Sequence, residues 1–159
     1  MKYIEEHQNS NFFVFALFFF FAAAALSVIG IGLNVYTQTV DSAASASEMR
    51  TSLSYLTEKI HQHNQSGAVS ITAVNDTPAL RLREQISGQT YDTTIYVKDG
   101  ELKEWFAAEG MPFTGSEGQT ITTLSAFDAQ IIAPGLLRLS LADTSGTRYT
   151  KTISFLEGP

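Results

Sequence analysis

The stretch Phe12–Val35, FFVFALFFFFAAAALSVIGIGLNV, decides the architecture of this chain of 159 residues. It contains seven phenylalanines and no charged side chain. An apolar segment of about 20 residues is long enough to cross a bilayer as an α-helix. A cleaved secretory signal has a shorter apolar core behind a basic start, whereas Met1–Glu6 is scarcely basic here. The stretch therefore predicts a transmembrane helix that is retained in the mature protein.

The charges around this segment predict its orientation and limit the partners. Lys2 and the terminal amine precede it, and the next basic residue after it is Arg50. The positive-inside rule then predicts a single-pass protein of the cell membrane, with a cytoplasmic N-terminus and an extracytoplasmic C-terminal domain. The formal net charge is −6 and the basic residues are not clustered, so we expect no direct binding of nucleic acid. The chain has no cysteine, which excludes disulfides and thiolate metal sites.

A second helical pattern follows the apolar run. Its apolar residues are spaced by 4, 3 and 4 and fall on one helical face: Met49, Leu53, Leu56 and Ile60. Gly67 is a plausible stop signal just beyond this segment. His61 and His63 are two residues apart and point to different sides of a helix, so we expect two solvated histidines and no metal site.

The remaining chain alternates between apolar and polar residues, as β-strands do. The alternating segments are Val69–Ala73, Leu80–Ile86, Thr93–Val97, Glu101–Phe106, Phe127–Ile131, Leu137–Leu141 and Thr147–Phe155. Asp99-Gly100 joins two of them and is a strong hairpin signal. Each strand has one polar face, which is typical of an antiparallel sheet with one face in water. We expect the stripe from Met49 to Ile60 to cover the other face, as a stalk-to-sheet contact.

The predicted fold class is therefore α+β: a long N-terminal helix, transmembrane and then amphipathic, packed on a small antiparallel β-sheet. The predicted parts are an N-terminal tail (1–11), a transmembrane helix (12–35), an amphipathic stalk helix (36–66) and a β domain (67–159). The break at 107–119 is rich in turn residues; it is either a partner-facing loop or a mobile connector, and the connector is favoured. We expect Trp105 and Phe106 to fill the core rather than mark a contact patch.

No pattern of catalytic, cofactor-binding or metal-ligating residues is found. The chain lacks a glycine-rich phosphate loop after a strand, a Gly-x-Ser-x-Gly elbow and a His-Glu-x-x-His motif. The β domain contains no histidine, the commonest general base. The sequence therefore predicts a protein that is not an enzyme and has no cofactor.

An apolar N-terminal helix that continues into an amphipathic stalk on a small sheet resembles the type IV pilin and pseudopilin superfamily. Leu53–Ile60 followed by Val69–Val74 is similar to the stalk-to-sheet junction of minor pseudopilins, and Thr94–Leu102 followed by Leu124–Phe127 is similar to their later strands. The nearest likenesses are the J-type minor pseudopilin of type II secretion and its counterpart in the Gram-positive competence pseudopilus. A Gram-positive family with a domain of unknown function also fits.

This resemblance implies a non-enzymatic subunit of a type IV filament, competence or secretion machine. Its partners would be the lipid bilayer and other pilin-like subunits. The residues expected in helix-to-helix packing are Phe12, Phe13, Phe15, Phe19, Ala43, Ala44 and Ala46. The alternative is a single-pass cell-surface module that binds a wall polymer or a small ligand.

The chain departs from the pilin pattern in its leader. Pilins carry a glycine before the mature helix and a glutamate five residues into it, whereas no glycine precedes Phe12 and no glutamate lies within Phe12–Val35. We therefore expect the mature protein to keep its N-terminus or lose only Met1. We also expect a low-copy subunit that forms no filaments on its own.

Overall fold

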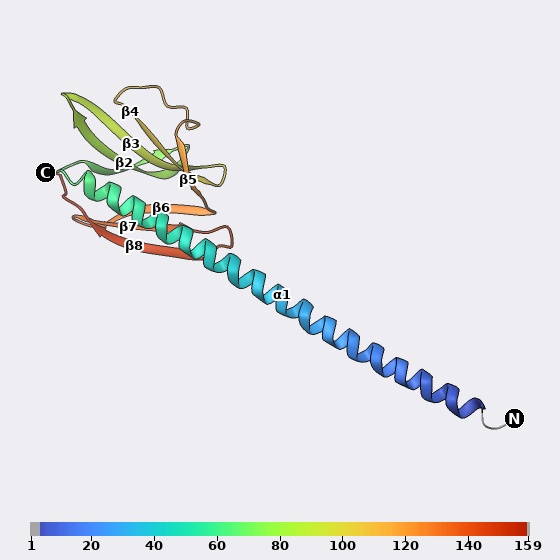
Figure 1. The fold of residues 1–159 in the computed structure, drawn as a ribbon. Helices are drawn as coiled ribbons and strands as arrows, with labels where there is room; N and C mark the ends of the chain where they lie inside the picture. The colour runs from blue at the N-terminus through green and yellow to red at the C-terminus, as the bar shows by residue number, and fades with distance from the viewer. Residues whose placement is uncertain (1–3, 159) are drawn as a thin grey trace. The chain divides into compact units, whose positions relative to one another are not determined.

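The structure, a computed structural model, describes residues 4–158, with side chains described from Phe12 onward. The predicted tail residues 1–3 lie outside the described range. The elements are α1 (Ile4–Gln62), β1 (Val69–Val74), β2 (Thr77–Ile86), β3 (Gln89–Lys98), β4 (Glu101–Ala108), β5 (Gln119–Thr123), β6 (Ala126–Ala133), β7 (Leu136–Ala142) and β8 (Arg148–Ser154). Figure 1 shows the single long helix and the β domain that follows it. The predicted α+β class, a long N-terminal helix followed by a small antiparallel β domain, is confirmed.

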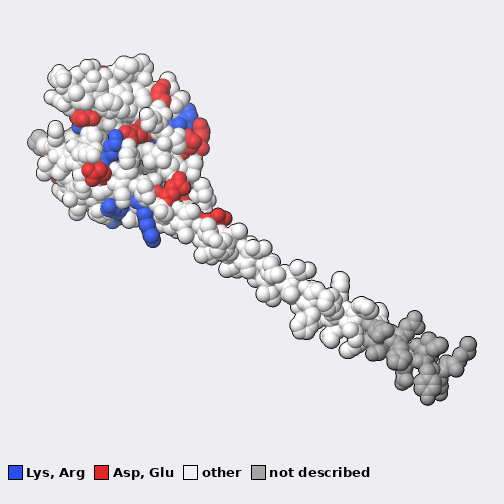
Figure 2. All heavy atoms as spheres, viewed as in Figure 1, with Lys and Arg blue, Asp and Glu red and all other residues white. Residues whose placement is uncertain are grey.

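The chain divides into two compact units, one ending at Ala44 and one beginning at Ser45. The first unit is the apolar part of α1. Its large apolar side chains between Phe12 and Val35 are 51% to 76% exposed. In Figure 2 the described part of this segment carries no red or blue atoms, because the sequence has no charge between Phe12 and Val40. The segment is long and apolar enough to cross a membrane.

The second unit, here called the head unit, contains two antiparallel sheets. Sheet A has the strand order β1-β2-β3-β4-β5, and sheet B has the order β6-β7-β8. The sequence patterns did not predict this division. The chain passes between the sheets at Leu124 and Ser125. The Leu124 amide donates to Gly100 O (2.9 Å) on sheet A, and the Ser125 amide donates to Ala142 O (2.8 Å) on sheet B.

One hydrophobic core joins both sheets to the last turns of α1. Met49, Leu53, Leu56 and Ile60 are between 0% and 6% exposed and lie in the same cluster as Leu80, Leu82, Ile95 and Leu102 of sheet A and Leu137, Leu139, Leu141 and Ile153 of sheet B. Figure 1 shows these turns of α1 running beside both sheets. The apolar stripe of the helix therefore completes the interior of the head unit.

Sheet A is made of tight hairpins. Lys98 pairs with Glu101 across Asp99-Gly100, where both turn residues have positive φ (52° and 77°), so the predicted hairpin is confirmed. Two positive φ angles are typical of a type I′ turn, whose twist suits a two-residue hairpin. Asn75-Asp76 and Ser87-Gly88 make similar turns before β2 and β3. Strand β5 was not among the predicted strands, because its sequence QTITT is short and mostly polar.

The prediction that each strand keeps one face in water is wrong for the middle of sheet A. Tyr96 and Thr94 point away from the main core, yet they are only 1% and 7% exposed. Phe113, from the loop after β4, packs edge-on against Tyr96 (5.1 Å between ring centroids) and stacks on Trp105 (4.5 Å). Trp105 thus packs, partly buried, against a second, smaller core on the outer face of the sheet. Phe106 is 49% exposed, so the prediction that it fills the core is wrong.

The loop between β4 and β5 is consequently part of the folded domain. The Glu117 carboxylate accepts bonds from the amides of Thr114 and Ser116 and from the Thr114 hydroxyl, while the Tyr96 hydroxyl donates to Glu117 O. The bonds to the carboxylate, that from the Thr114 side chain first, lower the pKa of Glu117 to about 2. The prediction of a mobile connector at residues 107–119 did not include this covering of the sheet.

Candidate functional site

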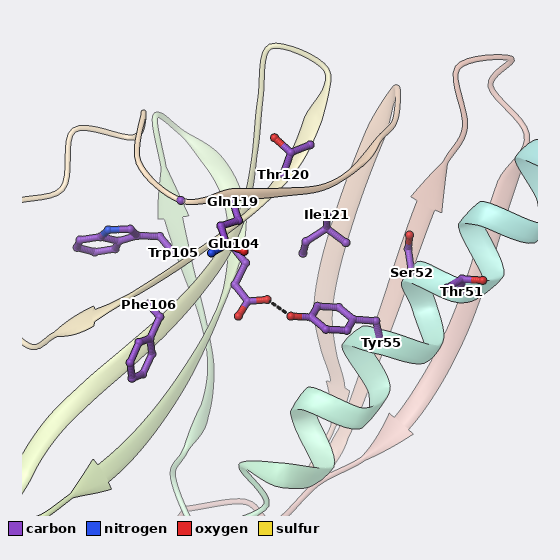
Figure 3. A pocket seen from close by; sticks show the side chains of 10 residues that line it. Thr51, Ser52, Tyr55, Glu104, Trp105, Phe106, Gln119, Thr120 and Ile121 are labelled. Carbon is purple, nitrogen blue, oxygen red and sulfur yellow. Dashed lines mark hydrogen bonds between the residues drawn. The ribbon is translucent and has the colours of Figure 1, made fainter.

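A groove of the head unit lies between α1 and sheet A. Its volume is about 600 Å³. Thr51, Ser52 and Tyr55 of α1 form one wall, residues 104–106 of β4 form the other, and residues 118–121 at the start of β5 close one end. Figure 3 shows Tyr55 and Glu104 reaching toward each other across it, with the side chain of Ile121 projecting from β5 beside them. The groove combines aromatic, hydroxyl and amide groups with a single carboxylate.

That carboxylate is held from two sides by the helix. The Tyr55 hydroxyl donates to Glu104 Oε2, as the dashed line in Figure 3 marks. Lys59 Nζ donates to Glu104 Oε1 at 2.6 Å, and the side chain of Glu104 is only 14% exposed. Tyr55 and Lys59 are one helical turn apart, so both reach the same strand residue. The negative charge of Glu104 is therefore compensated inside the protein.

This cluster changes the acidity of both helix side chains. Burial raises the pKa of Tyr55, and the adjacent Glu104 carboxylate raises that pKa further. For Lys59, burial alone lowers the pKa, but its hydrogen bond to Glu104 and the carboxylate charge leave the pKa above its usual value. Both groups thus keep their protons at neutral pH, and the cluster offers no activated base. Its geometry is that of a clamp between α1 and β4.

A second hollow of about 290 Å³ lies on the outer face of sheet A, beside the loop after β4. Arg83 lines this hollow and donates twice to Asp92 (2.8 and 3.0 Å) and once to Glu109 (2.7 Å). The hydrogen bond from Arg83 holds the pKa of Asp92 below its ordinary value. Because both acidic partners already occupy the guanidinium, this hollow presents no free charge of that arginine.

The residues predicted from the sequence fall into two groups. The four stripe residues, Met49, Leu53, Leu56 and Ile60, all lie in the core of the head unit. Those expected in helix-to-helix packing, Phe12, Phe13, Phe15, Phe19, Ala43 and Ala44, are exposed along α1, and Ala46 is partly buried. The six exposed residues all belong to the first unit of the chain.

The two histidines differ from expectation in one case. His61 is exposed, but His63 is 8% exposed, so the prediction that both are solvated is wrong. The last turn of α1 places its Nδ1 2.7 Å from Lys59 O and its Nε2 3.2 Å from the Glu84 carboxylate on β2. His63 therefore ties the end of the helix to sheet A. No metal-holding group of three His, Cys, Asp or Glu side chains occurs in the described chain.

Sequence reasoning did not single out Tyr55 or Glu104. The signal was present, because the alternation in Glu101–Ala108 places Glu104 on the same face as Leu102, toward the helix. A carboxylate at an inward position predicts a partner on the covering element. Tyr55 and Lys59 are not on the apolar stripe, and their partner becomes evident only from the placement of α1 on the sheet.

The family comparison concerns this same region. A family model described as a domain of unknown function, DUF4860, matches residues 47–144, which is well over half of the chain. The chain belongs to the DUF4860 family. The match begins two residues before Met49 and so includes the helical stripe, all of sheet A and most of sheet B. No curated protein and no solved structure matches the chain significantly.

The match adds no activity to the DUF4860 domain, and it is not a match to a pilin or pseudopilin family. A long apolar N-terminal helix followed by a β-sheet domain is compatible with a pilin-like architecture. The groove, the Tyr55–Glu104–Lys59 cluster and the covered outer face all lie within the matched residues.

Proposed function

We propose that this DUF4860 protein is a non-enzymatic subunit of a pilin-like assembly, anchored in the membrane by α1. The observation that carries the proposal is that one helix, α1, contains both an exposed apolar segment and part of the core of the head unit. Its apolar part exposes Phe12–Val35 on every side, and its last turns supply Met49 to Ile60 to the core of the head unit. Such a helix has to be covered by lipid or by other helices along its first part.

The exposed segment supports membrane insertion on energetic grounds. Phe12, Phe18 and Phe19 are 73% to 76% exposed, and each buried phenylalanine contributes about 1.5–3 kcal/mol when it leaves water. Seven phenylalanines within ten residues would be strongly unfavourable in solution. Lipid can bury these side chains without specific contacts, and neighbouring apolar helices can bury them through specific packing contacts. A single-pass anchor is the simplest arrangement that provides either.

The integration of α1 with the head supports an assembly subunit over a tethered binding module. A tethered module needs only a linker between anchor and domain, and its fold does not depend on the anchor. Here Leu56 and Ile60 are completely buried, so the helix that carries the apolar segment is also a wall of the domain.

Cross-linking in membranes tests this proposal. The chain has no cysteine, so a single Phe15→Cys or Ala43→Cys change gives a unique label site. We expect the protein to resist alkaline extraction from membranes and each cysteine to cross-link to another single-pass subunit in cells that carry the whole machine. Lys151→Cys, at an exposed position on β8, is the matched control. Extraction into the soluble fraction, or cross-linking equal to this control, would refute the proposal.

The groove gives weight to the second candidate, a cell-surface binding module. Its 600 Å³ volume and its aromatic and hydroxyl walls suit a small ligand or a polymer unit. Ligand binding by the isolated membrane protein, without any helix cross-links in cells, would favour this candidate.

A further inference from the structure

Strand β4 has a free edge where it borders the groove. It pairs with β3 along its whole length, as far as Tyr91 with Ala108, but β5 pairs only with residues 101–104. The Glu109 amide donates to Thr90 O at 2.9 Å, so residues 109 and 90 form a hydrogen-bonded pair. This pair shows which residues of β4 bond to β3 and which do not. In an antiparallel pair, alternate residues bond to one neighbour and the residues between them face the other. The main-chain N–H and C=O of Phe106 therefore point away from β3, toward the groove.

Gly118 is the reason that β5 does not continue along this edge. It has φ of +99°, a conformation that favours glycine, and a Cβ there would lie 2.4 Å from Glu104 O. Before Gly118 the chain runs over the outer face of the sheet, where Glu117 O accepts from Tyr96. The residues that would otherwise pair with Phe106 are thus held elsewhere. The edge stays open beside the side chains of Trp105 and Phe106.

The opposite wall offers a polar group without a partner. Ser52 is 5% exposed and lines the groove, and its hydroxyl makes no hydrogen bond to any described residue. No fully enclosed side-chain donor or acceptor lacks a partner in the described chain, so this hydroxyl reaches the groove. Glu104 is neutralised by Lys59, and Ile121 and Phe106 add apolar surface. The walls therefore suit an uncharged occupant that offers main-chain N–H and C=O groups and one apolar side chain.

We propose that the groove binds an extended, uncharged peptide segment of a partner protein, which adds to sheet A along the free edge of β4 in line with β5. Main-chain bonds to Phe106 give the segment its direction, and one apolar side chain fills the space between Tyr55 and Ile121. Strand addition of this kind uses an exposed edge for affinity and adjacent pockets for specificity. The identification of the partner as another assembly subunit rests on the proposed function; the binding mode does not.

A capped hexapeptide tests the mode directly. The probe is acetyl-Ser-Val-Thr-Leu-Thr-Ser-amide, titrated into the full-length protein in detergent micelles while amide signals are followed by NMR. Two further peptides carry N-methyl groups on alternate residues, one on the odd and one on the even positions. Only one alternate set of amides faces β4 in an added strand. We expect shifts at Phe106, Gln119 and Ser52, and an affinity difference of at least about tenfold between the two methylated peptides.

Two substitutions at one position separate main chain from side chain. Phe106→Pro removes the edge N–H without removing a bond to β3, and proline is tolerated at such edge positions. Phe106→Ala removes the ring and keeps the N–H. We expect Phe106→Pro to abolish peptide binding and Phe106→Ala to retain it more weakly. The methylated peptides act on the unaltered protein, so they remain decisive if the proline variant does not fold.

Equal affinity of the two methylated peptides would overturn the proposal, as would shifts confined to other surfaces. An oligomer of N-acetylglucosamine, titrated in parallel, distinguishes a saccharide site. Binding of that oligomer without peptide binding would overturn the proposal in favour of a polymer-binding module. Failure of the peptide would leave the membrane cross-links of the proposed function unaffected, and failure of the cross-links would leave peptide binding unaffected.

Discussion

Lys59 Nζ lies 2.6 Å from Glu104 Oε1, and this contact joins the last turns of α1 to strand β4. The two side chains are 24% and 14% exposed, so the pair is partly screened by solvent. Tyr55 completes the cluster from the preceding turn by donating to the other carboxylate oxygen. Because Tyr55 and Glu104 also line the groove, the clamp and the candidate binding surface share two residues.

Replacing Glu104 with glutamine is expected to lower the pKa of both Tyr55 and Lys59 toward their ordinary values. The carboxylate helps to raise both pKa values in the folded protein, so the folded state holds these protons more tightly than the unfolded chain. Their stabilising contribution is complete below about pH 10 and is lost as the pH rises through the folded pKa values. Denaturant unfolding between pH 8 and 11 should show a flatter loss of stability in Glu104→Gln. An unchanged slope would contradict the clamp.

Leu56→Ala is expected to destabilise the head unit by about 2–4 kcal/mol, since it leaves a cavity in a core that joins α1 to both sheets. Leu56 is 0% exposed and lies in the cluster that contains Leu80 and Leu139. The measurement is chemical unfolding of the full-length protein, followed by near-ultraviolet circular dichroism. Ser54→Ala, at an exposed position in the same turn, should change stability by less than about 0.5 kcal/mol. Equal effects of the two changes would contradict the packing.

The helical stripe and the main strands could be predicted from the sequence because each depends on a local period. Met49 to Ile60 repeat with the period of a helix, and Leu137, Leu139 and Leu141 repeat with the period of a strand. The Asp99-Gly100 hairpin has its own turn chemistry. Such patterns report which face of an element is apolar, and that is enough to locate most of the strands.

Long-range features had no comparable local signal. The division into two sheets depends on two main-chain bonds at Leu124 and Ser125, and any residue can supply those. The covered outer face depends on Phe113, whose surrounding sequence contains the turn residues of an ordinary loop. The candidate groove exists because α1 stands beside β4 while β5 is short. Each of these follows from tertiary placement rather than from the period of one segment.

Asp143→Asn is expected to lower stability at neutral pH and to flatten the loss of stability in acid. Ser145 and the amide of Thr147 hydrogen-bond the Asp143 carboxylate, which keeps its pKa below the ordinary value; the Ser145 side chain contributes most. The contribution of this carboxylate is therefore present above about pH 4 and is lost as the pH falls through the folded pKa. Urea unfolding at several values between pH 2.5 and 6 measures it. Asp128→Asn on β6 is the control, and identical acid profiles for both variants would refute the assignment.

Gly118→Ala and Gly110→Ala together separate backbone strain from steric exclusion at the start of β5. Both glycines have positive φ, +99° and +86°, so alanine is strained at either position. A Cβ at Gly110 meets nothing within 4 Å, whereas a Cβ at Gly118 would lie 2.4 Å from Glu104 O. We expect Gly110→Ala to cost about 1–2 kcal/mol, from the left-handed backbone alone. Gly118→Ala should cost clearly more, because the β4–β5 pairing at Gln119 must also shift. Hydrogen exchange at Lys103 and Thr120 would then accelerate in Gly118→Ala only. Equal stability of the two variants would show that Gly118 does not fix the point at which the chain leaves the edge of β4.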